Sequence, residues 1–232
     1  MQFPKSKPIV ISVGGSLIIP NGGPNVAFLK ALELLIRKEV KNGHRFVLVC
    51  GGGKTARHYI DAGAQIHSLD PEDLDWIGIH ATRLNAHLFR TILRDIAHPN
   101  VIKSPLSLPK KWKGKVLVAA GWKPGWSTDY VAARIAKRLG SKQVINLSNI
   151  SYVYEEDPRK NPKAKPLETL SWRDYRQMVG DDWSPGKSAP FDPVASRFCA
   201  KYHMSAAIMN GENLDRLAKL LKTGVLEGTY LA

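Results

Sequence analysis

Short, almost continuously apolar segments alternate along the chain with longer segments whose apolar residues recur every three to four positions. The first pattern is typical of strands buried on both faces, and the second of amphipathic helices. Strands are predicted at 9–13, 46–50, 116–120, 143–147 and 206–209. Helices are predicted at 28–40, 131–139, 194–202 and 214–221, and from an N-cap at Asp70 to about residue 96. This alternation predicts an α/β fold with a mainly parallel sheet between two layers of helices.

Proline and glycine mark the segments between these elements. Loops are predicted at 104–115, 159–166 and 181–193, and residues 224–230 are predicted to form a closing hairpin. The sequence has no internal repeat and no low-complexity tract. A length of 232 residues suits one α/β domain or two small lobes.

Composition narrows the class of protein. Hydrophobic residues make up 44% and charged residues 23%, which excludes wholesale disorder. No segment approaches the ~18 consecutive apolar residues of a membrane helix, and the polar start is not typical of a signal peptide. Cys50 and Cys199 lie in apolar contexts without metal-ligand spacing, so we expect reduced core residues in a cytoplasmic protein. The formal net charge of +14 favours anionic partners without naming them.

Three glycine clusters follow predicted strands: Gly14-Gly15-Ser16, residues 51–54, and Gly121 with Gly125. Glycine lets backbone N–H groups approach phosphate oxygens, and a helix that starts there adds its positive end. Arg57 is expected one turn into the next helix, pointing back towards the loop. The simpler interpretation is that these glycines only turn the chain. Three clusters with adjoining basic residues favour phosphate binding. The phosphate-loop motif GxxxxGK[ST] and the dinucleotide motif GxGxxG are both absent from these clusters.

Several longer segments carry a resemblance to a known family. They are VISVGGSLI, VCGGGKTARHYI, LDWIGIHATRLNAHL, GWKPGWSTDYVAARIA, NLSNISYVYEEDPRKNPKAK, FDPVASRFCAKY and GTYL. In this order and spacing they resemble the amino acid kinase superfamily and, within it, the uridylate (UMP) kinases of archaeal type. The resemblance implies a three-layer α/β/α sandwich, with an acceptor-binding lobe over about 1–120 and an ATP-binding lobe over about 121–232. It also implies transfer of the γ-phosphoryl group of ATP to UMP with Mg²⁺, in pyrimidine nucleotide biosynthesis, by a cytoplasmic homohexamer.

The resemblance also implies roles for individual residues. The ATP-binding residues would be Gly14, Gly15, Ser16, Gly53, Arg57, Ser148, Asn149, Tyr154 and Asp157. The UMP-binding residues would be Gly52, Asp75, Trp122, Lys123, Pro124, Gly125, Trp126, Ser127 and Thr128. Arg57, Asp129 and Asp192 would be catalytic, through charge neutralisation and the orientation of cations, and Mg²⁺ would be held through the ATP phosphates. UMP brings its own nucleophilic oxygen, so no general base is expected.

The chain departs from the family pattern at a few positions. Ser12 and Asn149 stand where bacterial-type members carry lysines, and archaeal-type members tend to lack both. Lys7 and Lys54 are candidate substitutes or simply solvated side chains. Ser151-Tyr152 replaces a usual Asp-Gly pair at the ATP edge.

Two features leave alternatives open. Trp122 and Trp126 in the acceptor loop would either stack on a base or fill a contact between subunits or lobes. His80 and His87 are interpreted as non-metal residues because no further ligands adjoin them.

Two other functions compete with UMP phosphorylation. The first is a sister kinase whose acceptor is a carbamate, a carboxylate or isopentenyl phosphate, although the basic segment 54–57 fits a phosphorylated acceptor better. The second is a non-catalytic protein that binds anions or nucleic acid. Trp112 among Lys110, Lys111, Lys113 and Lys115 motivates the second, because single-stranded nucleic acid favours aromatic residues among basic ones.

Overall fold

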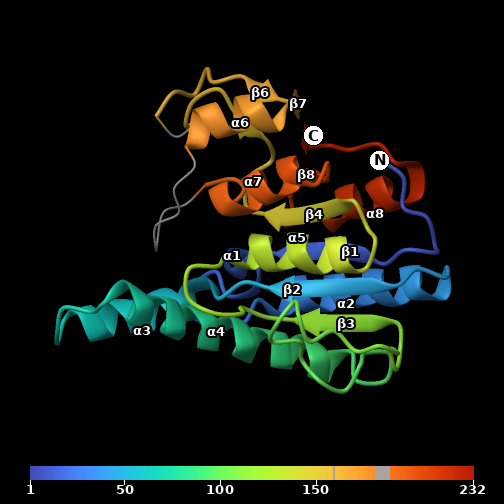
Figure 1. Cartoon of the computed structure of the whole chain (residues 1–232), viewed down its shortest axis with the longest axis horizontal. Helices are drawn as coiled ribbons and strands as arrows, with labels where there is room; N and C mark the ends of the chain where they lie inside the picture. Colours follow the sequence, from blue (N-terminus) through green and yellow to red (C-terminus); the bar gives the residue numbers. More distant parts are fainter. Residues whose placement is uncertain (159, 181–188) are drawn as a thin grey trace.

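The computed structural model describes residues 1–158, 160–180 and 189–232 and has the predicted alternation of strands and helices (Figure 1). The strands are β1 (Ile9–Val13), β2 (Phe46–Cys50), β3 (Val116–Ala119), β4 (Gln143–Ser148), β5 (Val153–Tyr154), β6 (Pro166–Leu167), β7 (Thr169–Leu170), β8 (Ser205–Asn210) and β9 (Thr229–Leu231). The helices are α1 (Gly15–Ile18), α2 (Val26–Lys41), α3 (Gly53–Ala64), α4 (Pro71–Ile92), α5 (Thr128–Arg138), α6 (Trp172–Val179), α7 (Pro193–Lys201) and α8 (Leu214–Thr223).

The central sheet has the strand order β3-β2-β1-β4-β8-β9-β7. The first five strands in this order are mutually parallel, whereas β9 runs antiparallel to β8, and β7 runs parallel to β9. A small separate sheet pairs β5 with β6. The mostly parallel sheet is confirmed, and it brings the ends of β1, β2 and β4 to one edge, where α/β folds bind ligands.

Alternate residues of each strand feed two separate cores, because successive side chains point to opposite faces of a sheet. Helices α1, α2, α4 and α8 pack on one face, and Cys50 lies in that core. Helices α5, α6 and α7 pack on the other face, and Cys199 lies there. Both cysteines are buried and unpaired, as predicted. The strands are apolar at nearly every position because both faces are covered, and the three-layer α/β/α sandwich is confirmed.

Two predicted elements are wrong in detail. Helix α4 ends at Ile92 and does not continue to about 96, because the chain turns and residues 97–102 run along the edge of β3. The tail is not a hairpin. Residues 229–231 form the single strand β9, which pairs with β8 and β7, and Gly224 ends α8 in a left-handed conformation.

The predicted loops are only partly described. Residue 159 of the loop at 159–166, and residues 181–188 of the loop at 181–193, lie outside the described residues. Asp70 precedes α4 as predicted, but its side chain makes no capping hydrogen bond, and Pro71 at the first helical position sets the start.

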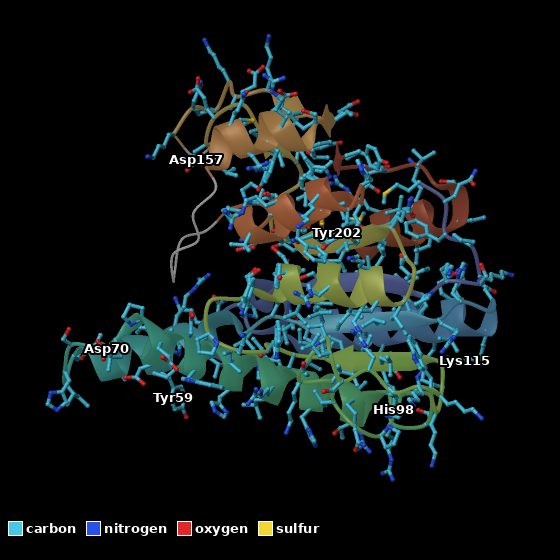
Figure 2. All side chains as sticks on the ribbon, in the orientation of Figure 1. Tyr59, Asp70, His98, Lys115, Asp157 and Tyr202 are labelled. Carbon is cyan, nitrogen blue, oxygen red and sulfur yellow. The ribbon has the colours of Figure 1, made fainter. Side chains whose placement is uncertain are left out.

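Helix α3 and the first turns of α4 project beyond the sheet, and Figure 2 shows Tyr59 and Asp70 on this projection. Helix α3 buries none of its residues, and Tyr59 is 69% exposed. In the ranges that the structure describes, no helix is long and apolar enough to cross a membrane.

Candidate active site

Five glycines meet where β1 and β2 end, and we call Gly14, Gly15, Gly51, Gly52 and Gly53 the glycine junction. A Cβ atom on Gly15 would overlap the backbone nitrogens of Gly52 and Gly53, and one on Gly51 would overlap the backbone of Gly15. Gly53 also has a φ of +67°, which L-residues with side chains rarely adopt. The two strand ends therefore approach each other so closely that only bare backbone fits between them.

The junction presents backbone donors that have no internal partner. In the described residues, the N–H groups of Gly15, Ser16, Gly52 and Gly53 have no acceptor. By contrast, the Asn85 side chain donates to the carbonyls of Gly51 and Gly52 at 2.8 and 3.1 Å, which ties down the acceptors. Helix α3 starts at Gly53 and adds the positive end of its dipole. Free donors beside a helix N-terminus suit phosphate oxygens.

Arg57 lies one turn into α3, as predicted. Its side chain is exposed, and Lys54 is half-buried at the start of the same helix. The expected turn of Arg57 towards the junction stays a prediction.

A buried polar group connects β1, β4 and α5. Asp129, in the first turn of α5, accepts hydrogen bonds from the Ser12 hydroxyl at 2.7 Å and the Asn146 amide at 3.0 Å. Ser12 and Asn146 are direct neighbours in the parallel register of β1 and β4, and both are almost fully buried. Burial raises the pKa of Asp129 to about 6, and the nearby charge of Asp192 adds to this shift.

Asp192 lies directly beside Asp129 at the start of α7. Its backbone N–H contacts the second oxygen of Asp129 at 3.3 Å, and its Oδ1 caps α7 by accepting from the N–H of Ala195 at 2.6 Å. Oδ2 is buried and has no hydrogen-bond partner among the described residues. Burial raises the pKa of this carboxyl group as well. The structure thus brings the two predicted acids together and leaves one buried carboxylate oxygen without a partner among the described residues.

The loop at 122–127 and the preceding Gly121 are anchored to α4 by three hydrogen bonds. Asp75 accepts from the N–H of Gly125 at 2.7 Å, and Arg83 donates to the carbonyl of Trp122 at 3.2 Å. Thr82 accepts from the N–H of Gly121 at 2.8 Å. Burial raises the pKa of Asp75, and the bond from Gly125 opposes this shift. Asp75 therefore already holds the loop through one carboxylate oxygen.

The tryptophans of this loop form a stack that continues into α5. Trp122 and Trp126 have ring centroids 6.0 Å apart, and Trp126 lies 4.2 Å from Tyr130 in a stacked arrangement. The Arg134 guanidinium lies over the rings of Trp122 and Tyr130. Lys123 and Gly125 are exposed, and Pro124 is half-buried. Ser127 caps α5 by accepting from Tyr130, and Thr128 is the first residue of that helix.

The residues predicted for the ATP side lie after β4. Ser148 ends the strand, and its hydroxyl contacts the side chain of Asn149, which is exposed. Tyr154 lies in β5, and its ring packs edge-on against that of Tyr152 at 6.4 Å. Figure 2 shows Asp157 on the β5–β6 excursion, above the α5–α7 layer and apart from α3. Tyr152 thus replaces the usual glycine with a ring that has a definite packing partner.

Sequence reasoning missed several supporting residues. Asn146, Asn85, Thr82 and Arg83 were not assigned contacts, although each bonds a predicted site element. The sequence feature that could have identified them is a polar residue within an otherwise apolar segment, such as Asn146 inside an apolar strand. In contrast, the ring of Trp112 lies under the guanidinium of Arg45 at 3.9 Å, so one of its faces is covered.

The fold and the junction together define an α/β protein with free backbone N–H groups at the carboxyl ends of its central strands, and comparison with known proteins gives its family. The amino acid kinase family model matches residues 7–210, and the chain belongs to this family. The uridylate kinase of Pyrococcus abyssi is 35% identical over 95% of this chain and 97% of its own length. The uridylate kinase of Methanospirillum hungatei is 36% identical over 96% and 94%. The crystal structure of uridylate kinase from Archaeoglobus fulgidus superposes with a TM-score of 0.78 at 27% identity, over 97% of this chain and 100% of that chain.

Proposed function

We propose that this protein is a nucleoside monophosphate kinase that transfers the γ-phosphoryl group of ATP to UMP and gives UDP. The observation that carries the proposal is the glycine junction, with its free N–H groups beside the paired carboxyl groups of Asp129 and Asp192. Full-length similarity to archaeal uridylate kinases supports UMP as the acceptor.

The junction would bind the transferred phosphoryl group. Phosphoryl transfer depends mainly on positioning and on neutralising charge. Free N–H groups of Gly15, Ser16, Gly52 and Gly53 would point at its oxygens without reorganising, because the backbone is close-packed. Arg57 would bridge the phosphates of the two nucleotides from α3. UMP attacks with its own phosphate oxygen, so none of these residues needs to act as a base.

Mg²⁺ would be held by ATP phosphates together with the acid pair. Mg²⁺ commonly takes one or two carboxylates and fills the rest of its shell with phosphates and water. The unpartnered Oδ2 of Asp192 fits that requirement, and Asp129 would orient this carboxylate through the backbone N–H of Asp192. Among the described residues, no group of three or more His, Cys, Asp or Glu could hold a metal alone. The ion would supply charge neutralisation at the phosphates.

The two substrates would bind mainly to different parts of the chain. Residues of about 1–120, with Asp75 and Gly52, would bind UMP together with the loop at 122–127. Residues of about 121–232, with Ser148, Asn149, Tyr154 and Asp157, would bind the adenosine side of ATP.

A homo-oligomer, a hexamer by family resemblance, would cover the apolar side chains that are exposed on α3, on α4 and in the segment between these helices. Tyr59 is 69%, Ile66 74% and Leu84 64% exposed. Light scattering coupled to size exclusion would measure the assembly. A monomer at micromolar concentration would contradict it. We place the enzyme in the cytoplasm and in pyrimidine nucleotide synthesis.

The deciding experiment is an ADP-release assay with ATP, Mg²⁺ and a panel of acceptors. We expect UMP to be preferred over the other nucleoside monophosphates. Carbamate, an amino acid carboxylate and isopentenyl phosphate complete the panel. Turnover of one of these three in place of UMP would assign a sister kinase, and no turnover with any acceptor would overturn the enzyme proposal.

A variant tests the role of Arg57. Arg57→Ala should lower kcat at least about a hundredfold, because the loss of one transition-state charge contact costs ~3 kcal/mol. Arg94→Ala, which removes another exposed arginine, is the matched control and should keep the wild-type rate. An unchanged rate in Arg57→Ala would remove Arg57 from the site.

A further inference from the structure

A cavity of about 520 Å³ lies at the edge of the sheet opposite the glycine junction. It is formed where β4 and β8 begin, where α7 ends and where α6 starts. Its floor contains Trp172, Met204 and Ser205, all nearly fully buried. None of the residues assigned to the candidate active site lines this cavity. Its volume is within the range of small-molecule sites.

Three cationic or basic side chains stand around the cavity, each on a different element. Lys142 precedes β4, Arg173 lies in the first turn of α6, and His203 follows α7. All three are exposed, and within the described ranges none of them has an ion-pair or side-chain hydrogen-bond partner. No Asp or Glu side chain lines the cavity, and the anionic group in its lining is the terminal carboxylate of Ala232. Three basic side chains face this single carboxylate, so the site keeps positive charge that a ligand can meet.

His203 holds a backbone conformation that other helix ends of this chain give to glycine. It has a φ of +49°, and it is the only non-glycine residue with positive φ in the described part of the chain. Gly140 and Gly224 hold the corresponding positions of positive φ after α5 and α8. A side chain at such a position costs free energy, so an imidazole kept there points to use of the side chain.

We propose that this cavity binds a small organic phosphate. A carboxylate carries one charge and is satisfied by a single two-pronged arginine, whereas a phosphate monoester carries up to two charges and three terminal oxygens. Three basic groups on three elements match the second arrangement. Trp172 and Met204 provide an apolar floor for the organic part. The proposal does not depend on the kinase assignment, because no residue is shared between the two sites.

Inorganic pyrophosphate is the probe, and the ring signals of His203 in ¹H–¹³C NMR spectra are the local readout. His203→Asn identifies these signals. Titration should shift them in a saturable way, and malonate at equal concentration should shift them at least about tenfold less effectively. Signals that do not move up to 10 mM pyrophosphate, or that move equally with malonate, would overturn the phosphate site.

Variants separate this cavity from the glycine junction. Lys142→Ala combined with Arg173→Ala should weaken the pyrophosphate effect about tenfold or more, since two charged contacts are lost. Lys30→Ala combined with Arg94→Ala removes the same charge from exposed positions elsewhere and should change the effect by less than twofold. Arg57→Ala should retain the full His203 response. Loss of the response in Arg57→Ala, with retention in the cavity double variant, would assign the ligand to the junction and contradict the proposal.

His203→Asn tests the conformational argument, because asparagine tolerates the left-handed region but brings no positive charge. Its Tm should stay within about 1–2 °C of the wild type. We follow pyrophosphate binding by calorimetry with the active site saturated by UMP. His203→Asn should weaken the same binding that Lys142→Ala combined with Arg173→Ala weakens. Unchanged binding would overturn the role of His203, and a large drop in Tm would show that its side chain is structural.

Discussion

The glycine junction and the loop at 122–127 are two parts of the candidate site that are held in place by different means. In the junction, backbone lies against backbone, and a Cβ on Gly15, Gly51 or Gly53 would overlap main-chain atoms. The loop depends on side chains instead: Asp75 and Arg83 reach from α4 and hold its backbone. Gly15, Gly51 and Gly53 therefore admit no side chain, whereas the loop depends on the particular side chains that reach it.

This difference suggests a division of roles, in which the junction serves phosphoryl transfer and the loop selects the acceptor. Close-packed backbone keeps its N–H groups in fixed directions, which suits the oxygens of a phosphoryl group. A loop held by side chains can change its lining while the sheet stays the same. We therefore expect substitutions in the junction to abolish turnover and substitutions around the loop to alter acceptor affinity.

The largest effect is expected at the junction. Gly15→Ala would force β1 and β2 apart, because neither Gly52 nor Gly53 can rotate away from the new methyl group. We expect kcat to fall about a thousandfold or more, and Tm to fall by several degrees, since overpacking costs ~1–3 kcal/mol. Gly23→Ala is the control, because a Cβ there meets nothing within 4 Å. Activity within tenfold of the wild type in Gly15→Ala would contradict the close approach.

The next effect concerns Asp129, the acid that accepts hydrogen bonds from Ser12 of β1 and Asn146 of β4. Asp129→Asn keeps the shape but removes the negative charge that orients the neighbouring groups, and we expect kcat to fall about a hundredfold. KM for UMP should change little, because the residue does not touch the loop backbone. Asp61→Asn on the exposed side of α3 is the matched control. Equal rates in the two variants would remove Asp129 from catalysis.

The same residue predicts a pH dependence of stability. The pKa of Asp129 is raised from 3.8 to about 6. Its contribution to folding is therefore fully present below about pH 4 and is lost as pH rises through about 6. Asparagine does not titrate, so the Tm of Asp129→Asn minus that of the wild type should become more positive between pH 4 and pH 7. Melting curves across this range measure the difference. A constant difference would indicate an ordinary pKa in the folded state.

The smallest effect is expected at the loop. Asp75→Asn weakens the charged acceptor that holds the N–H of Gly125. We expect KM for UMP to rise about tenfold, which corresponds to ~1.4 kcal/mol, because a charge-assisted hydrogen bond becomes a neutral one. KM for ATP should stay within twofold. Steady-state kinetics with each substrate varied in turn gives both values, and an equal rise in both KM values would break the division between junction and loop.

The sequence was sufficient for most of the fold because each core strand is apolar on both faces and each covering helix has one apolar stripe. The predicted end of α4 was wrong because the apolar pattern continues through Leu93, Ile96 and Ala97, although the chain has already turned there. The hairpin predicted at 224–230 was wrong because β9 pairs with β8 and β7, and no local sequence pattern reveals that pairing.

The glycines and acidic residues of the candidate site could be predicted from the sequence, because they follow predicted strands or match the family motifs. The joining of Asp129 with Asp192 was expected only from family resemblance, since the two residues are 63 positions apart. The part played by Asn146 follows from strand register, because only the pairing of β1 with β4 places it beside Ser12. Contacts of this kind are set by tertiary structure.

The two buried cysteines lie in different cores: Cys50 ends β2 in the core under α1, α2, α4 and α8, and Cys199 belongs to α7 in the core shared with α5 and α6. Burial raises the pKa of both thiols, so each is unreactive until its layer opens. The chain thus contains two natural thiol probes of local opening, one for each face of the sheet. Their alkylation rates, followed separately by mass spectrometry, would reveal whether the two helical layers detach together or one before the other.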